Sequence, residues 1–148
     1  MSVWIGVTLA IVVFCLAARV GFARERGFYP TVLIVIASYY VLFAVMGSAT
    51  RALAAETGFF LVFLGIAVAG FKWSTWLTIG GLAAHGIFDW LHSALVGNPG
   101  VPAFWPWFCL AFDFLLACCL AFAEVRRARH RRSSIDVASA PRHHHLLD

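Results

Sequence analysis

Five long apolar runs dominate this 148-residue sequence and constrain its fold more than any other feature. They cover residues 3–20, 30–47, 52–71, 75–96 and 104–123. A helix that crosses a bilayer needs about 17–25 residues of this kind. Only 12% of the chain is charged, against about 25% in a typical soluble domain. The sequence therefore predicts an all-α, polytopic membrane bundle of about five transmembrane helices, or four if the first or second run lies in the interface.

Short polar segments separate these runs and indicate how the helices connect. Pro30 suits the first turn of the second helix. Lys72-Trp73-Ser74 is so short that the third and fourth helices should be antiparallel neighbours, and Asn98 to Pro102 reads as a loop. Residues 1–124 are thus expected to form a single transmembrane domain, followed by a mobile basic tail over 125–148.

The positive charges predict how the chain is oriented in its membrane. With the N-terminus outside, ten of the eleven Lys and Arg residues lie in cytoplasmic segments, and only Arg51 lies outside. The positive-inside rule therefore predicts an N-out, C-in topology with the tail in the cytoplasm. The Ala-, Arg- and Gly-rich composition favours a multi-pass protein of a bacterial inner membrane.

The net charge of +4 does not indicate a nucleic-acid-binding protein. Five arginines crowd between Arg126 and Arg132, directly after the last apolar run. A basic cluster at that position typically faces anionic lipid headgroups. Neither interleaved aromatic residues nor a recognised nucleic-acid-binding motif accompanies the cluster. The expected partners are therefore the lipid bilayer and its anionic headgroups.

The most informative polar feature is a stripe of three ionisable residues inside the fourth apolar run. His85, Asp89 and His92 stand at positions i, i+4 and i+7 and fall within about 60° of one helical face. An ionisable residue at the centre of a transmembrane helix costs roughly 2.5–3.5 kcal/mol on insertion scales, and such residues usually face a bundle interior. The stripe is therefore the first place to look for a function.

Two further acids are predicted to lie at the same depth as this stripe. At about 1.5 Å of rise per residue, Asp113 in the fifth run and Glu56 in the third bracket it from neighbouring helices. All five residues then occupy the outer half of the membrane, and Tyr39, Tyr40 and Ser38 could add hydroxyl groups. We expect Asp89 and Asp113 to face each other, with at least one histidine within hydrogen-bond reach.

One interpretation of this cluster is a site for a divalent transition metal. Imidazole and carboxylate groups bind Zn, Fe, Mn or Cu, and His85, Asp89, His92 and Asp113 supply four such ligands. Because residues i and i+7 are about 10 Å apart along a helix, the two histidines are poorly placed to share one ion. His143 to His145 in the tail form a second, weak chelating tract.

A second interpretation is acid–base catalysis on a lipid-soluble substrate. Asp89, Asp113 and Glu56 would be the catalytic carboxylates, with a histidine as proton partner. Aromatic residues make up 16% of the chain and are frequent near the same depth, which is typical of a pocket for an apolar ligand. The sequence thus favours a small membrane enzyme or metal-binding protein, and leaves open whether it is an enzyme.

Two non-catalytic alternatives also remain open at this level. The polar residues could serve only helix packing in a membrane subunit or scaffold, although interhelical polar contacts contribute just about 0.6 kcal/mol on average. They could instead belong to a proton- or ion-conducting component, for which five short helices would need to form a homo-oligomer.

Overall fold

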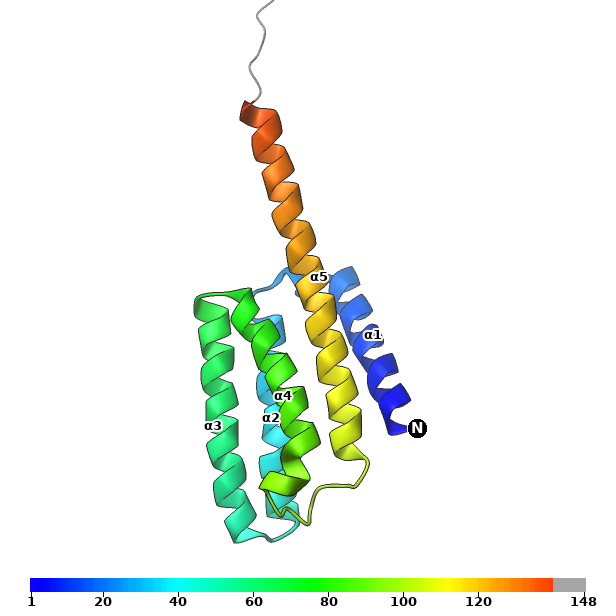
Figure 1. Cartoon of the computed structure of the whole chain (residues 1–148), viewed down its shortest axis with the longest axis vertical. Helices are drawn as coiled ribbons and strands as arrows, with labels where there is room; N and C mark the ends of the chain where they lie inside the picture. Colours follow the sequence, from blue (N-terminus) through cyan, green and yellow to red (C-terminus); the bar gives the residue numbers. More distant parts are fainter. Residues whose placement is uncertain (140–148) are drawn as a thin grey trace, which may run out of the picture.

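The chain folds into an all-helical bundle with one elongated end (Figure 1). The computed structural model describes residues 1–139, and the side chains as far as Ser134. Its helices are α1 (Ser2–Val20), α2 (Phe28–Met46), α3 (Thr50–Lys72), α4 (Thr75–Leu95) and α5 (Trp105–Ser139), with a short 3-10 turn, η1 (Phe22–Arg24), after α1.

Local sequence signals set the helix boundaries. Helix α1 ends at Gly21, whose left-handed conformation (φ 94°) is readily adopted only by a residue without a Cβ. Pro30 lies in the first turn of α2, where a proline loses no hydrogen bond. Ser74 caps α4, because its hydroxyl oxygen accepts a hydrogen bond from the Trp76 amide at 3.3 Å.

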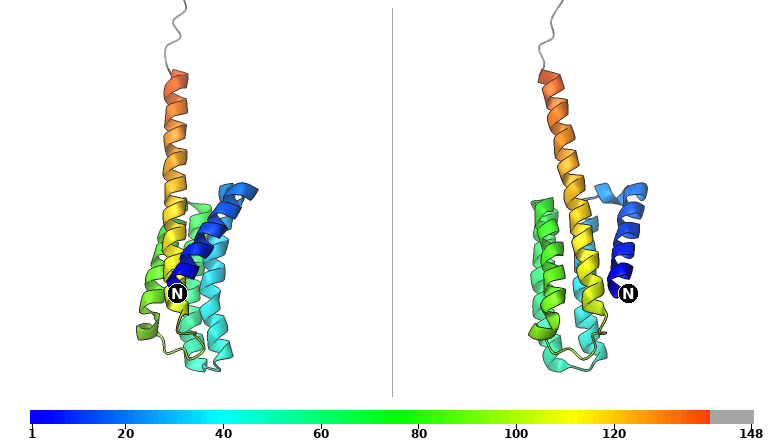
Figure 2. Two further views of the ribbon diagram at one scale, coloured as in Figure 1. Left: turned by 90° about the vertical axis from the view of Figure 1, so that its right-hand side faces the viewer. Right: turned by 45° about the vertical axis from the view of Figure 1, so that its right-hand side comes forward.

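Helices α2, α3, α4 and α5 run side by side, whereas α1 is tilted and packs on α5 (Figure 2). The contact between α1 and α5 depends on Gly6, since a Cβ there would overlap the Phe108 carbonyl. The core between α2, α3, α4 and α5 is filled by buried aromatic, leucine and alanine side chains.

Within residues 1–139, four helices, α1, α2, α3 and α5, are long and apolar enough to cross a membrane. Helix α4 has 21 residues and lies between α3 and α5, but its His-Asp-His stripe lowers its hydropathy. The predicted polytopic helical bundle is therefore confirmed. The α3–α4 turn, η1 and the extension of α5 lie at one end of the bundle, which we call the basic end, and Arg51 lies at the other (Figure 1).

The predicted end of the last helix at residue 123 is wrong. Helix α5 continues to Ser139, so the mobile tail expected from residue 125 is helical over its first part. The change to polar residues at Glu124 was interpreted as the end of the helix. Arginine, alanine and glutamate are, however, strong helix formers, and no glycine or proline interrupts 124–139. Residues 140–148, with the His143 to His145 tract, lie outside the described residues.

The loop between α4 and α5 is held close to the end of α2, and this contact yields a stability prediction. A Cβ on Gly100 would overlap the Phe43 carbonyl, while one on Gly97 would meet nothing within 4 Å. We expect Gly100→Ala to lower the free energy of unfolding by about 1–3 kcal/mol, as overpacking does, and Gly97→Ala to change it little. Thermal unfolding in detergent measures both, and equal transition temperatures would contradict this account of the loop.

Candidate functional site

All five ionisable residues that the sequence singled out are buried inside the bundle. The side chains of His85, Asp89 and Asp113 are 0% exposed, Glu56 is 1% exposed and His92 is 2% exposed. Ionisable groups are almost never fully buried unless they are paired. The structure sorts these five residues into two groups, one around His85 and one around His92.

The first group, which we call the His85 group, consists of His85, Asp89 and Asp113. His85 Nδ1 lies 2.7 Å from Asp113 Oδ2, across the α4–α5 contact, and 3.3 Å from Asp89 Oδ2, one turn along α4. One ligand atom from each residue lies within 4.8 Å of those of the other two. The expected approach of Asp89 and Asp113, with a histidine in hydrogen-bond reach, is therefore present.

The second group, which we call the His92 group, consists of Glu56, His92 and Asn98. His92 Nε2 is hydrogen-bonded to Glu56 Oε1 at 2.7 Å, and the Asn98 side-chain amide donates to the same oxygen at 2.9 Å. Asn98 also donates to the Tyr40 carbonyl at 3.2 Å. Glu56 of α3 and Asn98 of the α4–α5 loop thus fix the imidazole of His92 from two sides.

Tyr40 of α2 connects the two groups. Its hydroxyl donates a hydrogen bond to Asp89 Oδ1 at 2.7 Å, and its ring stacks on the imidazole of His92 with 4.1 Å between centroids. Its side chain is 1% exposed. The carboxylate of Asp89 is therefore held by α2 as well as by α4.

The sequence did not predict this division into two groups. His92, proposed as a fourth metal ligand, lies beside Glu56, while Glu56, proposed as a catalytic carboxylate, does not reach Asp89 or Asp113 within the described contacts. Asn98 was interpreted only as a loop residue. Asn98 follows α4 in the sequence and lies at the same end of the bundle as Glu56. This position is the sequence signal that could have identified Asn98 as a partner of Glu56.

Several polar atoms in these groups lack a hydrogen-bond partner in the described part of the chain. They are His85 Nε2, Asp89 Oδ2, Asp113 Oδ1 and Glu56 Oε2. A buried polar atom without a partner typically costs about 1–3 kcal/mol, so such atoms in a native protein require an explanation. Each of the two aspartates of the His85 group keeps one carboxylate oxygen free for a further contact.

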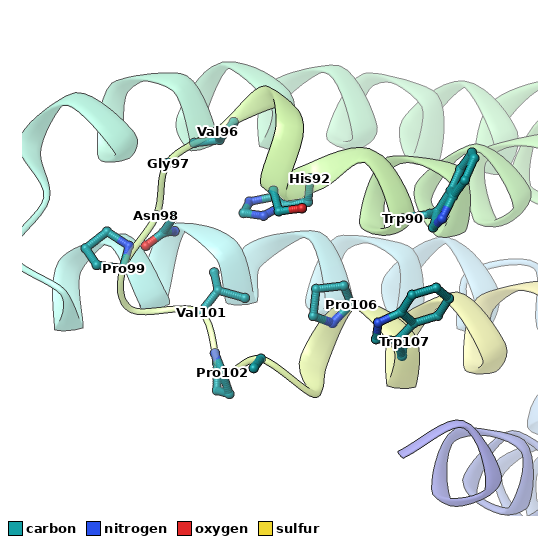
Figure 3. A pocket seen from close by; sticks show the side chains of 12 residues that line it. Trp90, His92, Val96, Gly97, Asn98, Pro99, Val101, Pro102, Pro106 and Trp107 are labelled. Atoms are coloured by element: carbon teal, nitrogen blue, oxygen red, sulfur yellow. The ribbon is translucent and has the colours of Figure 1, made fainter. Parts of the chain in front are cut away.

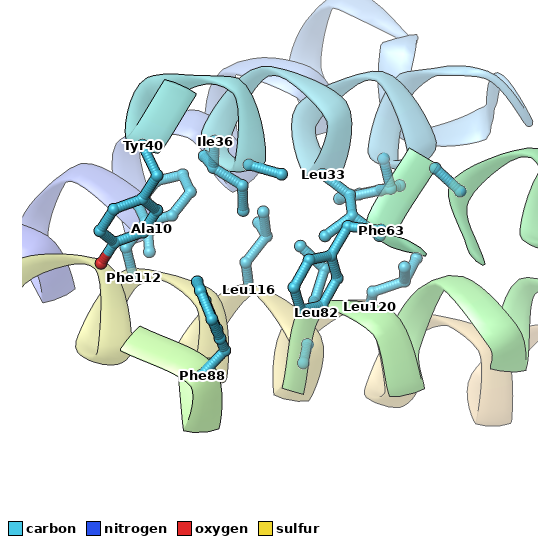
Figure 4. Packing of buried hydrophobic residues seen from close by; sticks show 14 of the residues in the cluster. Ala10, Leu33, Ile36, Tyr40, Phe63, Leu82, Phe88, Phe112, Leu116 and Leu120 are labelled. Atoms are coloured by element: carbon cyan, nitrogen blue, oxygen red, sulfur yellow. The ribbon is translucent and has the colours of Figure 1, made fainter. Parts of the chain in front are cut away.

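Toward the basic end the buried ionisable side chains are followed by leucines. Leu82 stands one turn before His85 on α4, Leu116 stands one turn after Asp113 on α5, and both are 0% exposed. Leu33 of α2 is also fully buried and packs in the same cluster (Figure 4). These leucines separate the His85 group from the basic end of the bundle.

Two pockets lie near the groups but do not include the His85 group. The end pocket has a volume of about 870 Å³ and is formed by the end of α4, the following loop and the start of α5, with His92 and Asn98 in its wall (Figure 3). The second pocket, of about 390 Å³, is an aromatic-lined groove between α1, α2 and α5. Its lining is largely apolar and aromatic, but Asp89, Asp113 and Glu56, beside which such a pocket was expected, do not line it.

Comparison with protein-family models, with curated proteins and with solved structures found no match to this chain. The class of protein therefore follows from the structure alone. The helices and the buried His/Asp group are those of a helical, multi-pass membrane protein with an ionisable site inside its bundle.

Proposed function

We propose that this protein is a metal-binding membrane protein that holds one divalent transition-metal ion in the His85 group. The observation that carries the proposal is the convergence of one imidazole and two carboxylates, all fully buried, with ligand atoms within 4.8 Å of one another. Imidazole and carboxylate are the ligands that zinc, iron and manganese share. A bound cation would also offset the two negative charges of Asp89 and Asp113.

One distance in the His85 group matches a zinc-like coordination sphere, whereas His85 Nδ1 and Asp113 Oδ2, at 2.7 Å, are hydrogen-bonded and would move apart when an ion binds. Two ligand atoms about 2.1 Å from a tetrahedral ion lie about 3.4 Å apart, and His85 Nδ1 is 3.3 Å from Asp89 Oδ2. Asp113 Oδ1, which has no hydrogen-bond partner among the described residues, offers a second ligand atom on that carboxylate. Three protein ligands leave one position for water or another ligand, which is typical of zinc sites that are not purely structural.

Tyr40 fits the role of an outer partner of such a site. Metal-bound carboxylates are usually hydrogen-bonded by a second residue that orients them. The Tyr40 hydroxyl donates to Asp89 Oδ1 and leaves Oδ2 free toward His85. Helix α2 therefore supports the ligand set without supplying a ligand.

Two observations favour this proposal over helix packing or ion conduction. Polar residues that served packing alone would pair completely, yet three atoms of the His85 group have no partner among the described residues. A conduction path would continue toward the basic end, where Leu82, Leu116 and Leu33 fill the core instead. A buried ion-binding site needs neither complete pairing nor a continuous path.

The membrane and the orientation proposed from the sequence complete this account. We place the protein in a bacterial inner membrane with its basic end in the cytoplasm, as the positive-inside rule requires. Arg127 donates to the Ala23 carbonyl at 2.7 Å and ties α5 to η1. Arg129, Arg131 and Arg132 are exposed beyond that point, where they would meet anionic headgroups.

Replacing Tyr40 with phenylalanine tests the metal site without removing a ligand. The variant loses only the hydroxyl that orients Asp89, and we expect its zinc affinity to fall by about 10–100-fold, as is typical when an outer partner is lost. Tyr39→Phe is the matched control, because Tyr39 is the adjacent tyrosine on α2 and its ring packs against Phe43 and Trp105 instead of the His85 group.

Zinc titration of purified protein, with a competing chelator, gives both affinities. The histidine tract at 143–145 should first be replaced by alanine to remove its own chelation. The proposal predicts one zinc ion per chain and a selective effect of Tyr40→Phe. Absence of zinc, manganese and iron binding by this protein, or equal affinities for the two tyrosine variants, would contradict it.

A further inference from the structure

The end pocket presents a second chemical feature that the metal site does not use. It lies where α4 ends and the loop crosses to α5, and its volume of about 870 Å³ is within the range of pockets that hold small molecules. His92 forms part of its wall (Figure 3). This histidine is separated from the His85 group by the ring of Tyr40.

The contacts of His92 determine what it can offer to a molecule in this pocket. Glu56 Oε1 already accepts from the Asn98 amide, so we assign the ring proton of His92 to Nε2; in this tautomer Nδ1 is a hydrogen-bond acceptor. Among the described residues Nδ1 has no hydrogen-bond partner, and the His92 side chain is 3% exposed in the wall of the end pocket. Stacking on Tyr40 and the bond to Glu56 prevent the ring from turning.

The remaining lining of the pocket indicates a neutral ligand. It contains neither a lysine or arginine to bind a phosphate nor an aspartate or glutamate to bind an amine. Trp90 of α4 and Trp107 of α5 contribute to it, with 59% and 50% of their surfaces exposed, together with three prolines. Aromatic rings at the end of a membrane bundle favour a ligand with its own ring and an apolar chain.

We infer that the end pocket binds a neutral, phenol-type amphiphile whose hydroxyl group donates a hydrogen bond to Nδ1 of His92. Its aromatic ring packs against Trp90 and Trp107, and its apolar chain extends into the membrane. Glu56 and Asn98 are positioning residues, because they hold the imidazole with the acceptor nitrogen free. This site goes beyond the proposed metal site and does not depend on a bound ion.

A matched pair of probes tests the hydrogen bond directly. 4-Hexylphenol carries the hydroxyl donor, and 4-hexylanisole replaces its hydrogen with a methyl group. We expect the wild-type protein in detergent to bind the phenol about tenfold more tightly than the anisole, as measured by quenching of tryptophan fluorescence. In His92→Leu, which lacks the acceptor, the two affinities should become equal.

Two further variants and one control variant keep the test decisive if His92→Leu does not fold. In Glu56→Gln the side-chain amide can donate to Nε2 of His92. The ring proton can then move to Nδ1, which no longer accepts a hydrogen bond, so the preference for the phenol should shrink. Trp107→Ala should weaken both probes, whereas Trp76→Ala, an exposed tryptophan at the other end of α4, should affect neither. Equal affinities in the wild-type protein, or a preference that persists in His92→Leu or is unchanged in Glu56→Gln, would overturn the inference. Zinc content measured on the same samples reports separately on the metal site.

Discussion

Replacing Asp113 with leucine is expected to lower the free energy of unfolding of the metal-free protein by about 3 kcal/mol. Asp113 Oδ2 is the closest partner of the His85 imidazole, at 2.7 Å, and both side chains are fully buried. Removing one partner of a buried pair leaves the other without compensation, and such changes typically cost about 3–5 kcal/mol. The lower value applies because Asp89 still lies 3.3 Å from His85 Nδ1.

The double variant His85→Leu/Asp113→Leu should recover most of this loss. Well-packed apolar residues in place of a buried pair are often neutral or stabilising, and the surroundings here already include Leu82 and Leu116. The double variant should nevertheless bind no metal. This combination would indicate that the polar pair is present for its chemistry and not for stability.

Denaturation in detergent and a zinc titration provide the measurement, on the wild-type protein, the single variants Asp113→Leu and His85→Leu, and the double variant. Phe122→Leu, at a 62% exposed position on the same helix, is the control for a substitution outside the site. If the double variant were less stable than Asp113→Leu alone, the pair would contribute to helix packing, and the packing interpretation would be favoured.

The helical architecture could be predicted from the sequence because its signals are local. The apolar runs place the helices, and Gly21, Pro30 and Ser74 mark boundaries that the structure shares. The end of α5 could not be placed in the same way. Where α5 extends past its apolar part, its residues become polar. The arginines and alanines there favour a helix in water as well, so the change in polarity does not mark the end of the helix.

The candidate site was predictable only in part, for a geometric reason. The stripe of His85, Asp89 and His92 follows from helical periodicity, and the burial of all three residues agrees with it. Counting residues along each helix also predicted that Asp113 and Glu56 lie at the same height in the bundle as this stripe. The rotation of α3 and α5 about their own axes is set by packing with other helices, so the sequence did not show which acid meets which histidine.

Tyr40 and Asn98 illustrate the same limit for polar residues that are not ionisable. Tyr39 and Tyr40 are adjacent and point about 100° apart on α2, yet only Tyr40 reaches Asp89. Asn98 looks like an ordinary loop residue between Gly97 and Pro99, and its role depends on the loop folding back over the end of α2 and α3. Both residues gain their function from contacts between distant segments.

Replacing Asp89 with asparagine is expected to abolish metal binding. The change keeps the size of the side chain and its hydrogen bond with Tyr40, but an amide is a poor ligand for transition metals and carries no charge. The affinity should fall by more than about 100-fold, beyond the range typical of an outer partner. Glu56→Gln makes the same chemical change in the His92 group, and it should leave the metal in place.

X-ray absorption at the zinc edge, recorded on the wild-type protein and these two variants, tests the metal site most directly. The wild-type and Glu56→Gln spectra should be alike, with one nitrogen and two or three oxygen ligands at about 2.0–2.2 Å. Asp89→Asn should retain no zinc. A spectrum dominated by several imidazoles, or zinc held with unchanged coordination in Asp89→Asn, would show that the ion is not bound by His85, Asp89 and Asp113.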